Sequence, residues 1–210
     1  MNAQILRNTE KEIEQLWNEG ELPYLTHLAG GNENWLVDFF AENVKPTDWI
    51  CASHRAHFHW MLHYGMQIAS DGKENGPLLA HISLIEKVKR GKSMFLYGPR
   101  FIQSAIVAGT CAIAVGLAKG AVLRGTGERV FCFVGVGAED EGHFYEAVRH
   151  VHATKLPCNF IIEDNNGSCG VTKEQRGSPD DWQWPDCVIR HRYTLAWPHA
   201  GSGKPMVLKK

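Results

Sequence analysis

Residues 130–138 have the sequence VFCFVGVGA, a continuous apolar run that ends in two glycines. The run is too short for a helix and is rich in Val and Phe, which is typical of a strand buried on both faces. A helical pattern follows over residues 141–153, and a second short apolar run over 159–162. Because strand, glycine loop, helix and strand in succession form a βαβ crossover, the sequence predicts an α/β fold with a parallel sheet flanked by helices.

The segments on either side of this unit predict further elements of one domain. Thr9 and Glu12 have the spacing of a capping box, and Gly20 is placed to end that first helix. We expect further helices over residues 32–43, 57–68, 81–89 and 104–124, and strands over 49–52 and 188–193. No internal repeat or linker is visible, so we expect a single domain over residues 1–210, with an irregular tail from about residue 171.

The composition excludes several classes of protein. The chain has 210 residues, of which 44% are hydrophobic and 21% charged, as in globular proteins rather than disordered ones. Lys and Arg number 22 against 23 for Asp and Glu, so there is no basic excess for nucleic acid. Residues 101–118 carry no charge, but they are rich in Gly and Ala and contain Gln103 and Ser104, which favours a buried helix over a membrane span.

The six cysteines indicate the compartment. No two of them form a C-x-x-C pair, and several lie inside apolar runs, where a free thiol behaves as a small hydrophobe. No secretory segment opens the chain. We therefore expect a reduced, cytoplasmic protein.

Two predicted strand ends carry the residues that could bind a ligand. In an open parallel sheet, ligands bind at the carboxyl ends of the strands. One such end leads into Gly135, Val136, Gly137 and Ala138, whose glycines let backbone amides approach an anion. The other leads into the oxygen-rich residues 163–167, so the pair predicts a diphosphate and Mg²⁺ site. The alternative is that both are ordinary βα turns, which also favour Gly, Asn and Asp.

These segments, in this order, resemble a known family. The sequences GVGA (135–138), GHFYEA (142–147), LP (156–157) and NN (165–166) resemble the thiamine diphosphate motif, in the version found in alpha subunits of the decarboxylating component of 2-oxo acid dehydrogenase complexes. Upstream, HLAGGNE (27–33), SHRAH (53–57), SM (93–94) and IVAG (106–109) resemble further landmarks of these subunits. The resemblance covers residues 5 to 172 and implies the thiamine diphosphate-binding fold.

The resemblance implies roles in cofactor binding. Arg55 matches the diphosphate-binding arginine of the family, and His54 replaces a tyrosine that also contacts phosphate. Val107 would contact the aminopyrimidine ring through its backbone. The loop residues Gly135, Gly137 and Ala138 would approach the diphosphate with their backbone amides. His57 matches a histidine that lines the pocket near the reacting thiazolium, which makes it the catalytic candidate.

The resemblance also implies a metal site, with one departure. Asn165 would bind Mg²⁺ through its side-chain oxygen and Gly167 through its carbonyl, and a shift of one residue would substitute Asn166 and Ser168. The aspartate of the motif is replaced here by Val136, which cannot coordinate a cation. Other acids stand close in sequence and could be considered as replacements: Glu139, Asp140, Glu141 and Asp164.

The implied function is that of an alpha-subunit-like component of a thiamine diphosphate-dependent 2-oxo acid dehydrogenase or decarboxylase. Such an oxidoreductase needs a beta subunit that carries the pyrimidine-binding domain, and it forms homo- or hetero-oligomers. The alternative is a degenerate, non-catalytic member of the fold that acts as an interaction protein, which the Val136 replacement favours. A zinc hydrolase built on His54, His57, His59 and His63 is a third reading, for which no acidic or Cys ligand stands in register.

Overall fold

The computed structural model describes residues 1–178 and 182–197, and the structural statements below concern these residues. The elements follow in the order α1 (Ala3–Asn18), α2 (Glu33–Asn43), β1 (Trp49–Ala52), α3 (His57–Ser70), α4 (Gly76–Lys89), β2 (Tyr97–Gly98), β3 (Phe101–Gln103), α5 (Cys111–Arg124), β4 (Val130–Gly135), the 3₁₀ turn η1 (Val136–Asp140), α6 (Gly142–Thr154), β5 (Cys158–Asp164), β6 (Gly167–Ser168), β7 (Val171–Thr172), α7 (Lys173–Arg176) and β8 (Val188–Arg192).

The main sheet has the strand order β2-β3-β1-β4-β5-β8. Every neighbouring pair is parallel except β2 with β3, which confirms the predicted α/β fold with a parallel sheet. The register pairs Val130 with Cys158 and Gly135 with Glu163, so β4 and β5 end at the same level. Their following loops therefore start side by side at one edge of the sheet.

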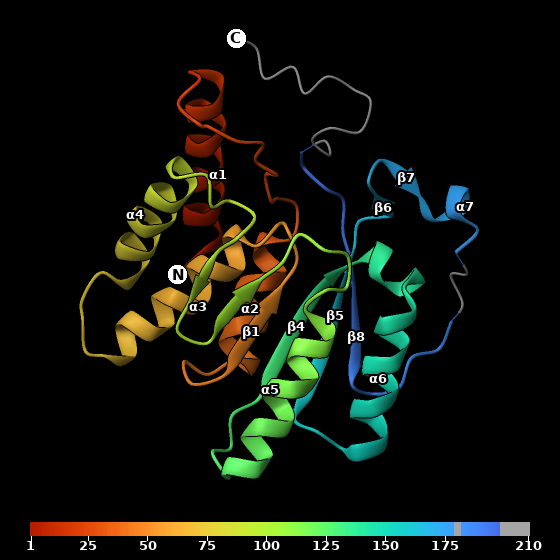
Figure 1. Cartoon of the computed structure of the whole chain (residues 1–210). Helices are drawn as coiled ribbons and strands as arrows, with labels where there is room; N and C mark the ends of the chain where they lie inside the picture. The colour runs from red at the N-terminus through yellow and green to blue at the C-terminus, as the bar shows by residue number, and fades with distance from the viewer. Residues whose placement is uncertain (179–181, 198–210) are drawn as a thin grey trace.

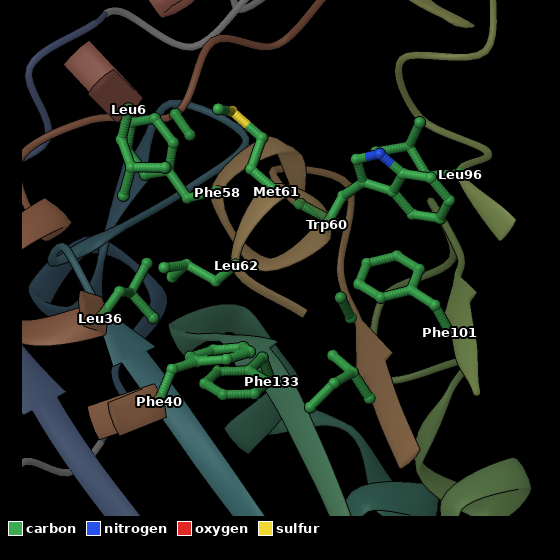
Figure 2. Close-up of a cluster of buried hydrophobic side chains, with 14 of the residues drawn as sticks. Leu6, Leu36, Phe40, Phe58, Trp60, Met61, Leu62, Leu96, Phe101 and Phe133 are labelled. Atoms are coloured by element: carbon green, nitrogen blue, oxygen red, sulfur yellow. The ribbon is translucent and has the colours of Figure 1, made fainter. Parts of the chain in front are cut away.

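Helices cover both faces of this sheet. On one face, α2 and α3 lie over the sheet and α1 and α4 pack on these two helices. The four helices share one core with β1 and β4, in which Phe40, Phe58 and Phe133 are fully or almost fully buried (Figure 2). On the other face, α5 and α6 lie side by side across the sheet (Figure 1). There the contact surface of α5 consists of small residues, Ala114 and Ala118 among them, which brings this helix close to the strands. Burial of both sheet faces explains the continuous apolar sequence of β4 and β5.

The structure corrects the starts of three predicted helices, one of which is α4, expected over residues 81–89 but beginning at Gly76. The first helix begins at Ala3, where the Asn2 side chain accepts the Ile5 N–H, so Thr9 lies inside the helix and donates to the Ile5 carbonyl. The predicted helix 104–124 begins only at Cys111, because residues 101–103 form β3, paired in parallel with β1.

The tail is more regular than the sequence predicted. From residue 171 the chain forms β7, the short helix α7 and the strand β8, which pairs in parallel with β5. The hairpin β6–β7 turns through Cys169 and Gly170, both with positive φ, as a two-residue hairpin loop requires. The part of the expected tail beyond residue 197 lies outside the described residues, and the single domain stays a prediction.

Two general expectations can be compared with the fold. All six cysteines are described and free, and burial raises the pKa of the Cys51 and Cys158 thiols, so these two act as apolar packing groups. In the described part of the chain, no helix combines the length and the apolar character needed to cross a membrane.

Candidate functional site

A cavity of about 310 Å³ lies at the carboxyl edge of the sheet, where the segments after β1, β3, β4, β5 and β8 converge. Parallel strands bring these segments together because their carboxyl ends share one edge. Most residues predicted for the cofactor or the metal line the cavity: His54, Arg55, Val107, Gly135, Gly137, Ala138, Asn165, Gly167 and Ser168. The lining does not include His57, Val136 or Asn166.

The segment after β1 supplies a charged side chain to the cavity wall. The Arg55 side chain is held in place by the Leu28 carbonyl, to which its Nη1 donates, and the residue is 8% exposed. Burial lowers the pKa of its guanidinium from the usual very high value, while the nearby Tyr193, Glu10 and Glu163 act in the opposite direction. The cavity therefore has one fixed arginine on its wall, which suits an anion.

A histidine to which the sequence analysis gave no role stands beside this arginine. His27 lines the cavity, and its ring meets that of His54 edge to face, with 4.8 Å between the centroids. The sequence signal was present, since His27 opens the motif at residues 27–33. What the sequence could not show is that the loop after β1 brings the ring of His54 against the ring of His27.

The loop after β4 presents only backbone and small side chains to the cavity. Gly135 and Gly137 both line it, and a Cβ at Gly137 would lie 2.1 Å from Ser168 Oγ. Gly137 is therefore a glycine because the β5 loop packs directly against it. Val136, between the two glycines, has no exposed surface and stays off the wall.

The loop after β5 presents Asn165 to the cavity, but its side chain already has partners. Its Oδ1 accepts the Gly167 N–H at 3.0 Å, and the side chain is also hydrogen-bonded to the phenol of Tyr193. Burial is the main cause that raises the pKa of this phenol, so Tyr193 is neutral. Asn166 has a φ of 60° and its backbone N–H donates to Asp164 Oδ1 at 3.0 Å. The geometry thus places Asn165, Gly167 and Ser168 on the cavity and Asn166 away from it.

His57, the catalytic candidate, lies behind the cavity wall. Its Nδ1 is 2.7 Å from Glu10 Oε1 and its Nε2 is 2.8 Å from Ser93 Oγ, and the ring is fully buried. Ser93 belongs to the Ser-Met landmark, and its carbonyl accepts from Gln103, whose amide also donates to the His54 carbonyl. This network supports the backbone that carries His54 and Arg55. The catalytic role of His57 stays a prediction.

Val107 lies at the rim of the cavity. Its carbonyl, the group expected to meet the aminopyrimidine ring, is 3.0 Å from Nε2 of His143 on α6. His143 is exposed at the start of that helix. A ring that bound at the Val107 carbonyl would therefore also lie close to the imidazole of His143.

The four histidines of the zinc hypothesis have separate surroundings. His54 and His59 line the cavity, whereas His57 is held by Glu10 and Ser93. Burial lowers the pKa of His63 to about 4, so that ring is neutral at pH 7. Across residues 1–178 and 182–197, no group of three or more His, Cys, Asp or Glu side chains could hold a metal ion.

Glu163 is the carboxylate that lines the cavity, and it faces the helices α2 and α3. It is 6% exposed and accepts from Asn32 Nδ2 at 2.7 Å. The Nε2 of His59 lies 3.3 Å from the same oxygen, and His59 itself is 2% exposed. Glu163 is therefore a buried carboxylate whose polar neighbours lie on the α2 and α3 side of the cavity.

The comparisons with known proteins concern the same segments. A sequence model of the family "Dehydrogenase E1 component" matches residues 1–182. The testis-specific alpha subunit of the rat mitochondrial pyruvate dehydrogenase E1 component is 27% identical over 228 residues, which cover 99% of this chain and 56% of the relative. The human somatic form is 26% identical over 185 residues, and the pig somatic form 28% over 180 residues, each covering 85% of this chain and 45% of the relative. The chain thus spans about half the length of the curated relatives it matches.

Proposed function

Because the chain belongs to the dehydrogenase E1 component family, we propose that it is an alpha-type component of a thiamine diphosphate-dependent 2-oxo acid dehydrogenase. The observation that carries the proposal is the cavity at which the loops after β1, β4 and β5 meet. This cavity would take the diphosphate end of the cofactor. The substrate would be a 2-oxo acid.

The donors on the cavity wall fit a diphosphate. Arg55 offers a guanidinium whose planar fork matches phosphate oxygens, and His54 adds a ring beside it. Gly137 and Ala138 contribute backbone next to Gly135, where nothing lies within 4 Å of a would-be Cβ. When bound, the cofactor supplies an electron sink for the carbon that loses carbon dioxide. The residues of this chain would bind and orient it and exclude water from it.

The residues do not fit a magnesium ion in the same way. The position of the motif aspartate is occupied by Val136, which is fully buried and carries no donor atom. Asn165 already hydrogen-bonds Gly167 and Tyr193. The magnesium implied by the resemblance therefore has weaker support than the diphosphate.

A beta-type partner is part of the proposal. Apolar side chains are exposed along the segment that leads from the cavity to α5, where Ile106 is 73% exposed and Val107 and Ile113 are about two-fifths exposed. Large apolar side chains exposed close together along the chain are consistent with a protein interface. We propose that a beta subunit with a pyrimidine-binding domain, or a second copy of this chain, covers it in a homo- or hetero-oligomer.

A second candidate function is kept because of Val136. A non-catalytic member of the fold, acting as an interaction protein, would keep this apolar surface while losing the metal ligand. The cytoplasmic location also stays a prediction, since the relatives named above are mitochondrial proteins.

The experiment that tests the proposal compares thiamine diphosphate with thiamine, which lacks the diphosphate. Calorimetric titration of the full chain should show binding of thiamine diphosphate and at least about tenfold weaker binding of thiamine. The chain alone should not decarboxylate pyruvate or a branched 2-oxo acid, because the pyrimidine-binding half of the site is expected on a beta subunit. Turnover by the pure chain would contradict this division. Equal, weak binding of both ligands would favour the non-catalytic alternative.

A further inference from the structure

The two expected metal ligands, Asn165 and Gly167, and the position of the motif aspartate, Val136, offer a metal no negative charge. Val136 is fully buried, Asn165 is a neutral amide with two partners, and Gly167 could give only a carbonyl. Magnesium sites in proteins usually combine one or two carboxylates with waters and substrate phosphates. The question is whether another acid of this chain replaces the lost one.

The acids next to the β4 and β5 loops are already neutralised by cations. Arg190 on β8 donates from Nη1 to Glu139 Oε2 at 2.9 Å and to Asp164 Oδ2 at 2.8 Å, and its Nη2 donates to Glu139 Oε1. Lys173 Nζ lies 3.6 Å from Glu139 and 3.7 Å from Asp164. Burial alone would lower the pKa of Arg190, but the hydrogen bonds to both acids outweigh this and raise it.

This group of two acids and two cations lies behind the cavity wall. Neither its acids nor its cations line the cavity, and both carboxylates are almost fully buried. Trp184 Nε1 adds a further donor to Glu139 Oε1 at 3.0 Å. Arg190 and Lys173 balance the two formal negative charges, and Arg192 Nε also lies 3.6 Å from Asp164, so the group leaves no unpaired carboxylate for a metal.

The remaining acids are also engaged or turned away. Asp140 accepts from Arg176 Nε at 2.7 Å and from Ser178 Oγ. Glu141 does not line the cavity. Glu163 does line it, but its Oε1 contacts Asn32, just before α2, and His59 on α3, on the other sheet face.

We propose that this cavity binds a diphosphate group without a divalent cation. The counter-charge comes from Arg55, which the Leu28 carbonyl fixes on the wall, and the backbone amides of the β4 loop and the ring of His54 add hydrogen-bonding groups. The inference rests on the proposed function, because the diphosphate is that of thiamine diphosphate. It differs from what the family resemblance implies, since it assigns the metal's electrostatic role to side chains and backbone of this chain.

The test is calorimetric titration of the full chain with thiamine diphosphate and, separately, with inorganic diphosphate. Each titration is performed in excess EDTA and in millimolar MgCl₂. The expected result is binding of both ligands in EDTA, with dissociation constants within about threefold of those in MgCl₂. A gain of about tenfold or more from Mg²⁺ would overturn the inference, since it corresponds to about 1.4 kcal/mol supplied by the metal.

The two ligands separate this inference from the proposed function. Binding of thiamine diphosphate only in MgCl₂ overturns the metal-free site and leaves the proposed function standing. Binding of inorganic diphosphate in EDTA, with no added affinity for thiamine diphosphate, supports the metal-free site and removes the proposed function. No binding of either ligand in EDTA overturns the inference.

Variants of two arginines locate the counter-charge. Arg55→Gln should weaken diphosphate binding in EDTA at least about tenfold, because one charge-assisted hydrogen-bonding group is lost. Arg129→Gln is the matched control: Arg129 lies just before β4, at the opposite end of the strands, where it donates to Asn159. This control should bind within about twofold of the parent chain.

The fold of both variants is checked by circular dichroism. If Arg55→Gln does not fold, Arg55→Lys keeps the charge but loses the planar fork, and it should show an intermediate loss of affinity. Unchanged diphosphate binding by a folded Arg55 variant would overturn the assignment.

Discussion

The loops after β4 and β5 leave the sheet at the same level, with Gly135 and Glu163 paired in register, but they contribute to the cavity in different ways. The β4 loop offers backbone, because Val136 points into the protein and the glycines carry no side chain. The end of β5 and the loop after it offer side chains: Glu163 and Asn165 line the cavity, while Asp164 between them pairs with Arg190. Residues alternate between faces along a strand, so these two share a side and Asp164 does not.

The difference teaches how a site can lose one part of its chemistry and keep another. Contacts made by backbone depend on the path of the chain, which neighbouring loops fix, as Ser168 does for Gly137. Contacts made by a side chain depend on one residue type at one position. On the function proposed above, a valine in place of the motif aspartate would therefore remove a metal ligand and leave the backbone path of the β4 loop unchanged.

The largest change in stability that tests the difference between the two loops is expected for Val136→Asp. The new carboxyl would lie where no surface is exposed, so we expect a loss of about 3–5 kcal/mol in the free energy of unfolding at pH 8. Burial raises the pKa of such a carboxyl in the folded state. The destabilisation is then complete above that pKa and becomes smaller as the pH falls toward the unfolded-state value of about 3.9.

Urea unfolding of this variant at pH 8 and pH 5 measures the effect. Val136→Asn introduces a side chain of similar shape to aspartate without its charge. We expect it to lower the free energy of unfolding less, and by an amount that does not change between these two pH values. A Val136→Asp variant with parental stability and a new affinity for Mg²⁺ would show that the β4 loop can still turn this position toward the cavity.

The second-largest change in stability is expected from removing Arg190, which neutralises the buried carboxylates Glu139 and Asp164. Arg190→Met would leave Glu139 and Asp164 with Lys173 as their nearest remaining buried cation, and we expect a loss of about 2–4 kcal/mol. Arg192→Met is the control, since Arg192 is largely exposed and its Nε lies 3.6 Å from Asp164. Its loss should be at most about 1 kcal/mol. Equal losses in chemical denaturation would argue against the special role of Arg190.

The third effect tests the contact between the two loops. Gly137→Ala would bring a Cβ to 2.1 Å from Ser168 Oγ, and we expect a cost of about 1–3 kcal/mol. The double variant Gly137→Ala with Ser168→Gly should recover a large part of it. Gly135→Ala is the matched control, because nothing lies within 4 Å of its would-be Cβ. A cost at Gly135 as large as that at Gly137 would contradict the proposed packing.

The smallest effect is expected at Asn165. Asn165→Ala removes the oxygen that accepts the Gly167 N–H, which should lower the free energy of unfolding by about 1 kcal/mol. Asn165→Asp keeps an acceptor oxygen and should retain most of that stability. If Asn165→Ala is as stable as the parent chain, the hydrogen bond does not hold this loop.

The sequence predicted four of the six strands of the main sheet, and most of the residues expected at the site do line the cavity. Apolar runs of strand length followed by Gly-rich or Asn-rich loops placed β4, β5 and their carboxyl ends correctly, because local patterning and buried parallel strands leave few alternatives. The sequence-based prediction was less reliable where strand pairing outweighs the local helix preference. It predicted a helix from residue 104. In the structure, residues 101–103 pair with β1 and the helix starts at Cys111.

By itself the sequence determined the fold class, the family landmarks and the missing aspartate at Val136. Only the tertiary structure decided that Val136 is buried, that Glu139 and Asp164 are neutralised by Arg190 from β8, and that His57 lies behind the wall while His27 stands on it. The physical reason is the separation along the chain between interacting residues. A motif fixes residue types a few positions apart, but the charge and exposure of each group depend on partners that the fold brings from many residues away.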